Sequence, residues 1–377
     1  MTLDGGAGSM GAMKDRVWNF SAGPANLPVS VLEEARDQLL ALPGAGASIL
    51  EISHRSAAFD AVIAEAEASL RDLLRLGDGH RVLFLQGGAS LQFSMVPMNL
   101  LRGAARPAAY VVTGAWGAKA VAEAEREGPV AVVWDGAADG YRDVPILESL
   151  EIDPASPYLH VTSNETIGGV EFPGGFERPS GPPLVVDASS DFLSRPLPMD
   201  RYGLLYAGAQ KNAGPAGLTV AILREDVLGR VADGSPTMFD YRTYVEHGSR
   251  YNTPPVFAIY ILMLVTRWLR DEVGGLEKMH ERNVEKADLL YEAIDTSDGF
   301  YRGHAHVRAR SLMNVTFGIA ELELEAAFIA GAAERDLVEL RGHRSVGGIR
   351  ASIYNAMPLE GVVELRDFME AFRLDHA

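Results

Sequence analysis

The sequence predicts an α/β fold: a large domain with a mostly parallel sheet covered by helices, followed by a smaller α+β C-terminal domain. Short apolar runs alternate with segments of helical periodicity from about residue 30 to about residue 270. The runs are partly β-branched and apolar on both faces, as strands buried between two layers of helices must be. After residue 272 the order changes, because long helices are followed by strands and helices in mixed order.

Seven apolar runs are the predicted strands of the large domain, which is expected to span residues 30–272. Helical periodicity separates several of them, as in residues 91–101 and 118–126, so right-handed crossovers are expected to connect them. In chain order the predicted strands are residues 82–85, 109–113, 130–134, 159–162, 184–187, 203–207 and 218–223.

The smaller domain is expected to combine residues 16–29 with residues 273–377. Long helices are predicted over residues 255–294, with a break at Gly274-Gly275. Residues 1–15 are small, polar and aperiodic, and are predicted to be a flexible tail outside the fold. The remaining predicted elements are a strand over 312–319, a helix over 324–335, strands over 337–340 and 349–354, and a closing helix over 359–372.

Composition excludes several classes of protein. No apolar stretch can span a bilayer and the start does not resemble a signal peptide, so a cytoplasmic protein without a membrane partner is expected. The absence of cysteine excludes disulfides and thiolate metal sites, and His304-x-His306 lacks partner acids at ligand spacing, so no metal is expected. The net charge of −17 argues against a nucleic-acid partner.

Lys211 is the most informative residue. It is the only charged residue between Arg201 and Arg224, whereas Lys286 and the other lysines lie in the tail or in charged helical patterns. A desolvated lysine has a lowered pKa and can attack an aldehyde, which is the chemistry that fixes pyridoxal phosphate on an enzyme. Taken alone, a lysine that extends from a strand end to water is the more ordinary interpretation.

A phosphate site is predicted after the first strand, where Gln86-Gly87-Gly88-Ala89-Ser90 leads into a helix. Small residues let backbone N–H groups approach an anion, and the helix dipole favours negative charge there. The alternative is a plain strand–turn–helix with a serine N-cap.

Two further residues end predicted strands. Asp187 stands at the carboxyl end of a buried strand, where α/β sheets bind ligands, and there it could pair with a pyridine nitrogen. Trp116 follows another strand and could stack on a flat ring. The alternatives are a helix N-cap for Asp187 and a core position for Trp116.

Two His-Arg pairs, His54-Arg55 and His343-Arg344, and nearby Arg350 suggest a site for a dianion, because arginine binds carboxylate or phosphate in a bidentate fork. The alternative is that the pairs are solvated surface residues.

Several motifs together resemble the phosphoserine aminotransferase family, collinearly from about residue 17 to the C-terminus. The most specific is Gly342-His343-Arg344, followed by the run from Gly347 to Met357. The others are Asn19-Phe20-Ser21-Ala22-Gly23-Pro24, Ser53-His54-Arg55, the run from Gln86 to Phe93, Asn164-Glu165-Thr166-Ile167 and Asn252-Thr253-Pro254-Pro255.

The resemblance implies a pyridoxal-phosphate-dependent transferase of fold type I and class V that works as a homodimer with shared active sites. By motif match, Lys211 would form the Schiff base, Asp187 would pair with the pyridine nitrogen, Trp116 would stack on the ring and Thr166 would bond its hydroxyl. The residues implied to hold the cofactor phosphate are Ala89, Ser90 and Gln210, with Asn252 and Thr253 of the partner subunit.

For the substrate, the resemblance assigns the α-carboxylate to Arg350. The residues implied to bind the distal phosphate or the glutamate carboxylate are His54, Arg55, His343 and Arg344. Ala22 departs from the serine that many members have there, which leaves the role of that position open.

The implied reaction interconverts O-phospho-L-serine and 2-oxoglutarate with 3-phosphooxypyruvate and L-glutamate, in serine biosynthesis. The same site is expected to accept 4-phosphooxy-L-threonine, in pyridoxine biosynthesis. The alternative is another class V transaminase, acting on alanine, serine or glyoxylate, whose substrates lack a distal dianion. A cysteine desulfurase is disfavoured because the chain has no cysteine. A cofactor-free binding protein is disfavoured by the presence of both Lys211 and Asp187.

Overall fold

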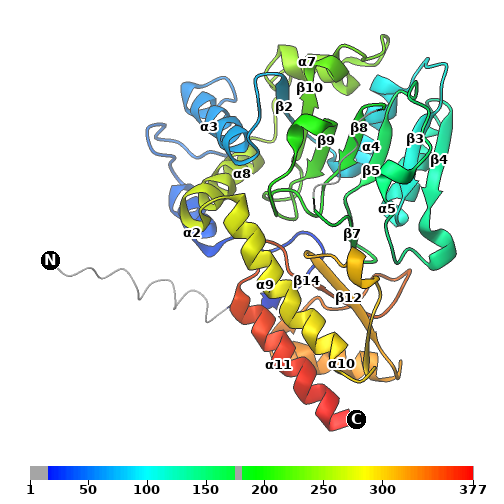
Figure 1. The fold of residues 1–377 in the computed structure, drawn as a ribbon. Helices are drawn as coiled ribbons and strands as arrows, with labels where there is room; N and C mark the ends of the chain where they lie inside the picture. Colours follow the sequence, from blue (N-terminus) through cyan, green and yellow to red (C-terminus); the bar gives the residue numbers. More distant parts are fainter. Residues whose placement is uncertain (1–15, 175–180, 377) are drawn as a thin grey trace.

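The computed structural model describes residues 16–174 and 181–376, so the predicted tail at residues 1–15 lies outside the described residues. Figure 1 shows a large sheet flanked by helices and, below it, a smaller unit built around the C-terminal helices. The α-helices are α2 (Val29–Gln38), α3 (Ala57–Leu73), α4 (Gly88–Leu100), α5 (Ala115–Ala124), α6 (Glu225–Leu228), α7 (Tyr241–Glu246), α8 (Val256–Trp268), α9 (Leu276–Asp295), α10 (Leu324–Ala333) and α11 (Leu359–His376).

The large sheet has seven strands in the spatial order β2-β10-β9-β8-β5-β3-β4. Neighbouring strands are parallel except at β10, which is antiparallel to both β2 and β9. All seven predicted strands are present, each within two residues of its predicted bounds. They are β2 (His80–Leu85), β3 (Ala108–Val112), β4 (Val130–Asp135), β5 (Leu159–Thr162), β8 (Leu184–Asp187), β9 (Tyr202–Gly208) and β10 (Thr219–Arg224).

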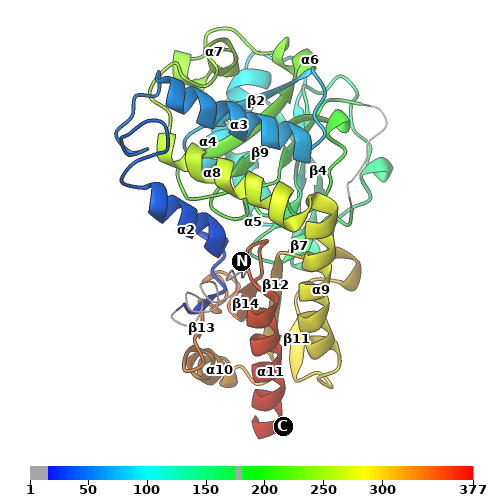
Figure 2. The same ribbon diagram turned by 90° about the vertical axis from the view of Figure 1, so that its left-hand side faces the viewer.

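Each face of this sheet packs against its own helices. Leu184 and Val186 of β8 belong to a cluster that includes α3 and α8, which Figure 2 shows lying in front of the sheet. Val185, between them, belongs to a second cluster that includes α4, α5 and α7. Successive side chains of a strand point to opposite faces, so a strand covered on both sides must be apolar throughout.

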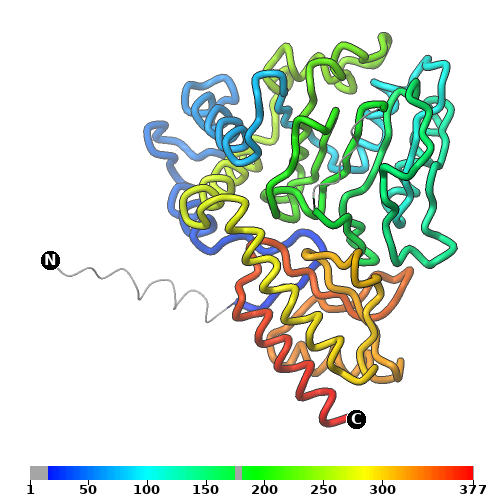
Figure 3. Tube along the Cα trace, in the orientation of Figure 1, coloured from blue at the N-terminus to red at the C-terminus, as the bar shows by residue number. Residues whose placement is uncertain are grey.

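The smaller unit joins the two ends of the described chain. An antiparallel sheet has the order β11 (Tyr301–Gly303), β12 (Asn314–Ile319), β14 (Ile349–Ser352). Near it, β1 (Trp18–Asn19) pairs in parallel with β13 (Leu337–Val338), and Figure 3 shows the N-terminal segment in blue beside the orange and red C-terminal segments.

A third hydrophobic cluster holds this unit together. Phe20 packs there with side chains of α9, β12 and α11, so residues near the start of the chain share a core with the end. The predicted domain boundaries, at residues 29/30 and 272/273, stay a prediction.

The long predicted helical region, 255–294, is two helices. α8 continues as a π-helical turn, Leu269–Val273, which ends at Gly274 with φ +90°, and α9 begins at Leu276. A φ of that sign favours glycine, so the Gly274-Gly275 break is confirmed. The closing helix α11 extends to His376, four residues beyond its predicted end at Phe372.

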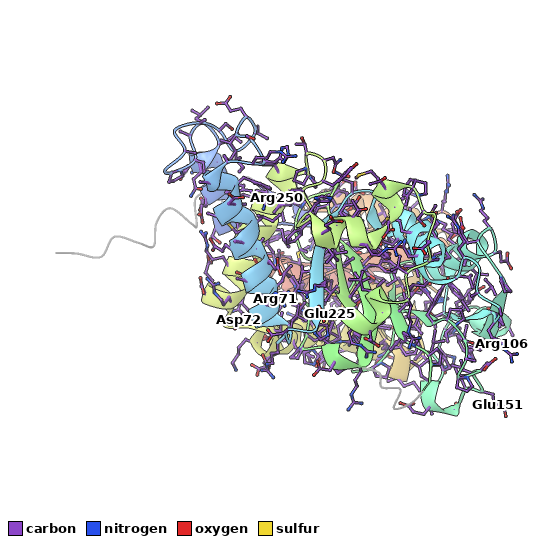
Figure 4. All side chains as sticks on the ribbon, turned by 90° about the horizontal axis from the view of Figure 1, so that it is seen from above. Arg71, Asp72, Arg106, Glu151, Glu225 and Arg250 are labelled. Atoms are coloured by element: carbon purple, nitrogen blue, oxygen red, sulfur yellow. The ribbon has the colours of Figure 1, made fainter. Side chains whose placement is uncertain are left out.

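Most charged side chains lie at the surface. In Figure 4, Arg106 and Glu151 lie at the edge of the molecule opposite α3, the helix that carries Arg71 and Asp72. Among the described residues no helix is both long and apolar enough to cross a membrane.

Lys286 lies in a charged helix, as its sequence pattern indicates, but its side chain on α9 is only 3% exposed. Its Nζ donates hydrogen bonds to the carbonyls of Ile353 (2.8 Å), Tyr354 (2.8 Å) and Met357 (3.2 Å). Lys211 is therefore not the only desolvated lysine in the chain.

Candidate active site

A cavity of about 360 Å³ opens at the carboxyl ends of the parallel strands. Thr162 and Asp187 end β5 and β8, and Lys211 follows β9 after a short turn, so three strand ends converge there. This is the edge at which α/β sheets bind ligands. The predicted site residues that line the cavity are Ala89, Ser90, Trp116, Thr166, Asp187, Gln210, Lys211, His343 and Arg350.

Lys211 lies with its amine inside this cavity. Its Nζ donates a 2.6 Å hydrogen bond to Oγ1 of Thr166. Burial lowers the pKa of Lys211 to about 8, while the carboxylates of Asp187 and Glu165 act in the opposite direction. A lysine with that pKa is partly neutral near pH 8, so it can act both as a nucleophile and as a proton acceptor.

Asp187 is 3% exposed and faces the same cavity. One carboxylate oxygen, Oδ1, accepts a 3.0 Å hydrogen bond from the backbone N–H of Ser189. Burial raises the pKa of Asp187, whereas Ser189 and the charge of Lys211 lower it. No helix follows at once, so the N-cap alternative for this residue is wrong.

The start of α4 forms one wall of the cavity. The helix begins at Gly88 with Gly87 as its N-cap, so the predicted alternative of a serine N-cap is wrong. Gly87 has φ +88°, and a Cβ there would lie 2.5 Å from Cβ of Leu91, so the turn requires glycine. The first turn carries no acidic side chain, which leaves its backbone N–H groups available to an anion.

Trp116 lies in the first turn of α5, where it packs against the edge of a hydrophobic cluster and is partly exposed at the cavity wall. The amine of Lys119 lies 4.0 Å from the centroid of its ring. The ring of Phe93, in α4, lies 6.5 Å away between centroids.

The cationic residues predicted to bind substrate divide into two groups. His343 and Arg350 line the cavity, and Arg344 is exposed beside His343. Nε of Arg350 is buried and has no hydrogen-bond partner among the described residues. Burial, followed by the nearby charges of Arg350 and Arg344, lowers the pKa of His343.

The second group does not reach this cavity within its own chain. Oγ1 of Thr253 lies 3.3 Å from Nδ1 of His54, and neither residue lines the cavity around Lys211. Arg55, with Arg250 and Tyr251, lines a separate open cavity of about 550 Å³. Asn252, like Arg55 and Thr253, is exposed.

The cavity wall also has polar atoms that sequence reasoning missed. Thr162 Oγ1, Asn164 Oδ1 and Trp116 Nε1 are buried and have no hydrogen-bond partner among the described residues. Buried polar atoms are normally satisfied, so these atoms fit a cavity that receives a polar ligand. In the sequence, the Asn164-Glu165-Thr166 motif could have indicated that these residues form part of the cavity wall. Among the described residues no cluster could hold a metal ion.

Comparisons with known proteins agree with this geometry. The family model for class V aminotransferases matches residues 17–365. A phosphoserine aminotransferase of Rhodopirellula baltica is 55% identical over 366 residues, which cover 97% of each chain. A second one, of Geobacillus kaustophilus, is 52% identical over 95% of this chain and 98% of its own.

Solved structures give the same result. The phosphoserine aminotransferase of Bacillus circulans subsp. alkalophilus superposes with a TM-score of 0.93, at 48% identity over 96% of this chain and 100% of that one. A phosphoserine aminotransferase of Trichomonas vaginalis, solved with pyridoxal phosphate bound, superposes with a TM-score of 0.88, at 38% identity over 94% and 100% of the two chains.

Proposed function

The chain belongs to the class V aminotransferases, and we propose that it transfers the amino group of O-phospho-L-serine reversibly to 2-oxoglutarate. The products are 3-phosphooxypyruvate and L-glutamate, a step of serine biosynthesis. Pyridoxal phosphate is the cofactor. The observation that carries the proposal is a half-buried Lys211 with a lowered pKa, in one cavity with Asp187 and Arg350.

The residues present fit this cofactor. When bound, pyridoxal phosphate supplies an aldehyde that bonds to an amine and a ring that withdraws electrons from the reacting carbon. Nζ of Lys211 would hold the cofactor by condensing with that aldehyde, with loss of water, and as a free amine it would move a proton between the substrate Cα and the cofactor C4′. Asp187 would keep the pyridine nitrogen protonated, and Thr166 would orient the ring hydroxyl.

Two walls of the cavity hold the rest of the cofactor. The N–H groups at the start of α4, with Ala89, Ser90 and Gln210, bind the phosphate. The indole of Trp116 stacks on the ring. The unsatisfied atoms of Thr162 and Trp116 support the presence of a polar ligand at this position.

The substrate is bound through its two anionic ends. Arg350 takes the α-carboxylate, because its guanidinium lines the cavity and has an unpaired Nε. His343 and Arg344 bind the distal phosphate, with His54 and Arg55 of the partner subunit.

A second copy of the chain completes each site. Leu40, Leu50 and Tyr251 are exposed by 88%, 63% and 47%. Leu50 and Tyr251 are close in sequence to His54 and Thr253, which are in contact with each other. The exposed apolar side chains of Leu50 and Tyr251, next to site residues that lie outside the cavity, support a two-fold interface between copies. The cytoplasm is the proposed location, and the absence of cysteine is compatible with it.

The same site is proposed to accept 4-phosphooxy-L-threonine, which carries the same two anionic ends. A coupled assay with glutamate and a panel of keto acids tests the substrate class. We expect rapid turnover with 3-phosphooxypyruvate and little with pyruvate or glyoxylate. Faster turnover with glyoxylate or pyruvate would instead identify the other class V transaminases.

A further inference from the structure

Glu165 is a buried carboxylate beside the cavity, and it is only 1% exposed. Its Oε1 accepts a 2.9 Å hydrogen bond from the backbone N–H of Gly117, and its Oε2 accepts a 3.2 Å bond from that of Trp116. These N–H groups belong to the first turn of α5, where backbone donors have no partner within the helix. One carboxylate thus caps the helix that carries Trp116.

Gly114 provides the space that this carboxylate occupies. A Cβ on Gly114, the N-cap of α5, would lie 2.6 Å from Cδ of Glu165, closer than real contacts allow. Gly114 has φ 169°, which any residue can adopt, so glycine is required there for space alone. The absence of a side chain at Gly114 therefore leaves room for the carboxylate of Glu165.

This contact joins two walls of the cavity. Glu165 ends β6 (Asn164–Glu165), and the next residue is Thr166, which accepts the hydrogen bond of the Lys211 amine. On the other side lies Trp116, held at its backbone by the same carboxylate. A shift of Glu165 would therefore displace Trp116 relative to Lys211.

We propose that Glu165 is a positioning residue that fixes the indole of Trp116 at the place where a flat cofactor ring stacks. The proposal rests on the proposed function only in requiring that the cavity binds pyridoxal phosphate. Burial raises the pKa of Glu165 to about 7, so its side chain is mostly a carboxylate at pH 8, where the measurements below are made. Bonds from N–H groups to a carboxylate are stronger than those to a neutral amide, so Glu165→Gln should weaken the contact and Glu165→Ala should abolish it.

The test isolates the signal of Trp116. Of the four tryptophans in the chain, Trp18, Trp134 and Trp268 are replaced by phenylalanine, so the fluorescence of the protein reports on Trp116 alone. Glu165→Ala, Glu165→Gln and a control are made in this background. The control is Asp240→Ala, which removes the carboxylate that accepts from the N–H of Arg242 at the start of α7.

Two properties are measured: quenching of Trp116 by acrylamide in the cofactor-free protein, and the rate of pyridoxal phosphate release. For Glu165→Ala, which removes both hydrogen bonds to the start of α5, we expect a quenching constant changed at least twofold and release of pyridoxal phosphate faster by roughly tenfold. Glu165→Gln should fall between Glu165→Ala and the background protein. Asp240→Ala should lower the unfolding midpoint and leave both properties unchanged.

If Glu165→Ala does not fold, quenching and cofactor release measured on Glu165→Gln test the proposal. Either folded variant with unchanged quenching and release, or with changes no larger than those of Asp240→Ala, would overturn the positioning role. Failure of the background protein itself to bind pyridoxal phosphate would contradict the proposed function instead, so the two failures are distinguishable.

Discussion

Burial determines the reactivity of Lys211. The protein around the amine of Lys211 partly removes it from water, which disfavours its charged form, and Asp187 partly offsets this effect. The amine is therefore closer to neutrality at working pH than an exposed lysine. The same burial raises the pKa of Asp187, and the two opposite charges stabilise each other in the cavity.

The rate at which the cofactor-free protein binds pyridoxal phosphate should follow the neutral fraction of Lys211. Because its pKa is lowered to about 8, the rate should rise with pH and level off above about pH 8. Asp187→Asn should move this midpoint to lower pH, since it removes the charge that raises the pKa. Stopped-flow absorbance would measure both profiles. A midpoint near the ordinary value for lysine would contradict the account.

Arg344→Ala should reduce kcat/KM for phosphoserine far more than for alanine as amino donor. Loss of one charge-assisted bond to a dianion should raise the barrier by about 1.5–3 kcal/mol. Arg341→Ala, an exposed arginine three residues earlier, is the control and should change neither value. Equal losses on both donors would show that Arg344 has a structural role.

At the scale of elements, sequence patterns located the strands but could not give every direction. An apolar run has the same pattern whichever way its strand points, so the pattern of β10 did not predict its direction. In the structure β10 is antiparallel to both of its neighbours. The length of the connection between β9 and β10 could have predicted the antiparallel direction. The ten residues between Gly208 and Thr219 are too few for a usual parallel crossover. The burial of Lys286 had no such local signal, because its partners lie 67 to 71 residues later in the chain.

Lys286 should contribute strongly to stability, because it ties α9 to the segment after β14. Lys286→Met leaves three carbonyls without their donor, and we expect a loss of about 2–4 kcal/mol in the free energy of unfolding. Lys278→Met, at an exposed position of the same helix, should change it by less than about 0.5 kcal/mol. Urea titration would measure both. Equal effects would show that the three hydrogen bonds contribute little.

At the scale of the whole molecule, the predicted site residues of one chain do not all lie together. Nine of the fourteen predicted site residues line one cavity, and Arg344 is exposed beside one of them, His343. The other four, His54, Arg55, Asn252 and Thr253, lie outside the cavity. The motifs of the family pointed to all of these residues, whereas the patterns of a single chain could not tell which of them act across an interface. In the proposed dimer, the residues that lie outside the cavity of their own chain complete the site of the partner subunit.

Subunit exchange between two inactive variants, Lys211→Ala and Arg55→Ala, tests the shared site. In a mixed dimer, one site carries both defects and the other carries neither if Arg55 acts across the interface. Random pairing makes about half of the dimers mixed, so activity should return toward about a quarter of wild type. An inactive mixture with verified exchange would show that Arg55 acts within its own chain.

The central claim, that Lys211 holds pyridoxal phosphate, is tested most directly by borohydride reduction of the cofactor-loaded protein and peptide mapping by mass spectrometry. Burial lowers the pKa of Lys211 to about 8 and that of Lys286 to about 7, so basicity alone would not favour Lys211. Among the lysines that the structure describes, only Lys211 lies in the cavity with Asp187 and Thr166. We predict one pyridoxyl group per chain, on Lys211. Label on Lys286 or another lysine, or no label after reconstitution, would contradict the account.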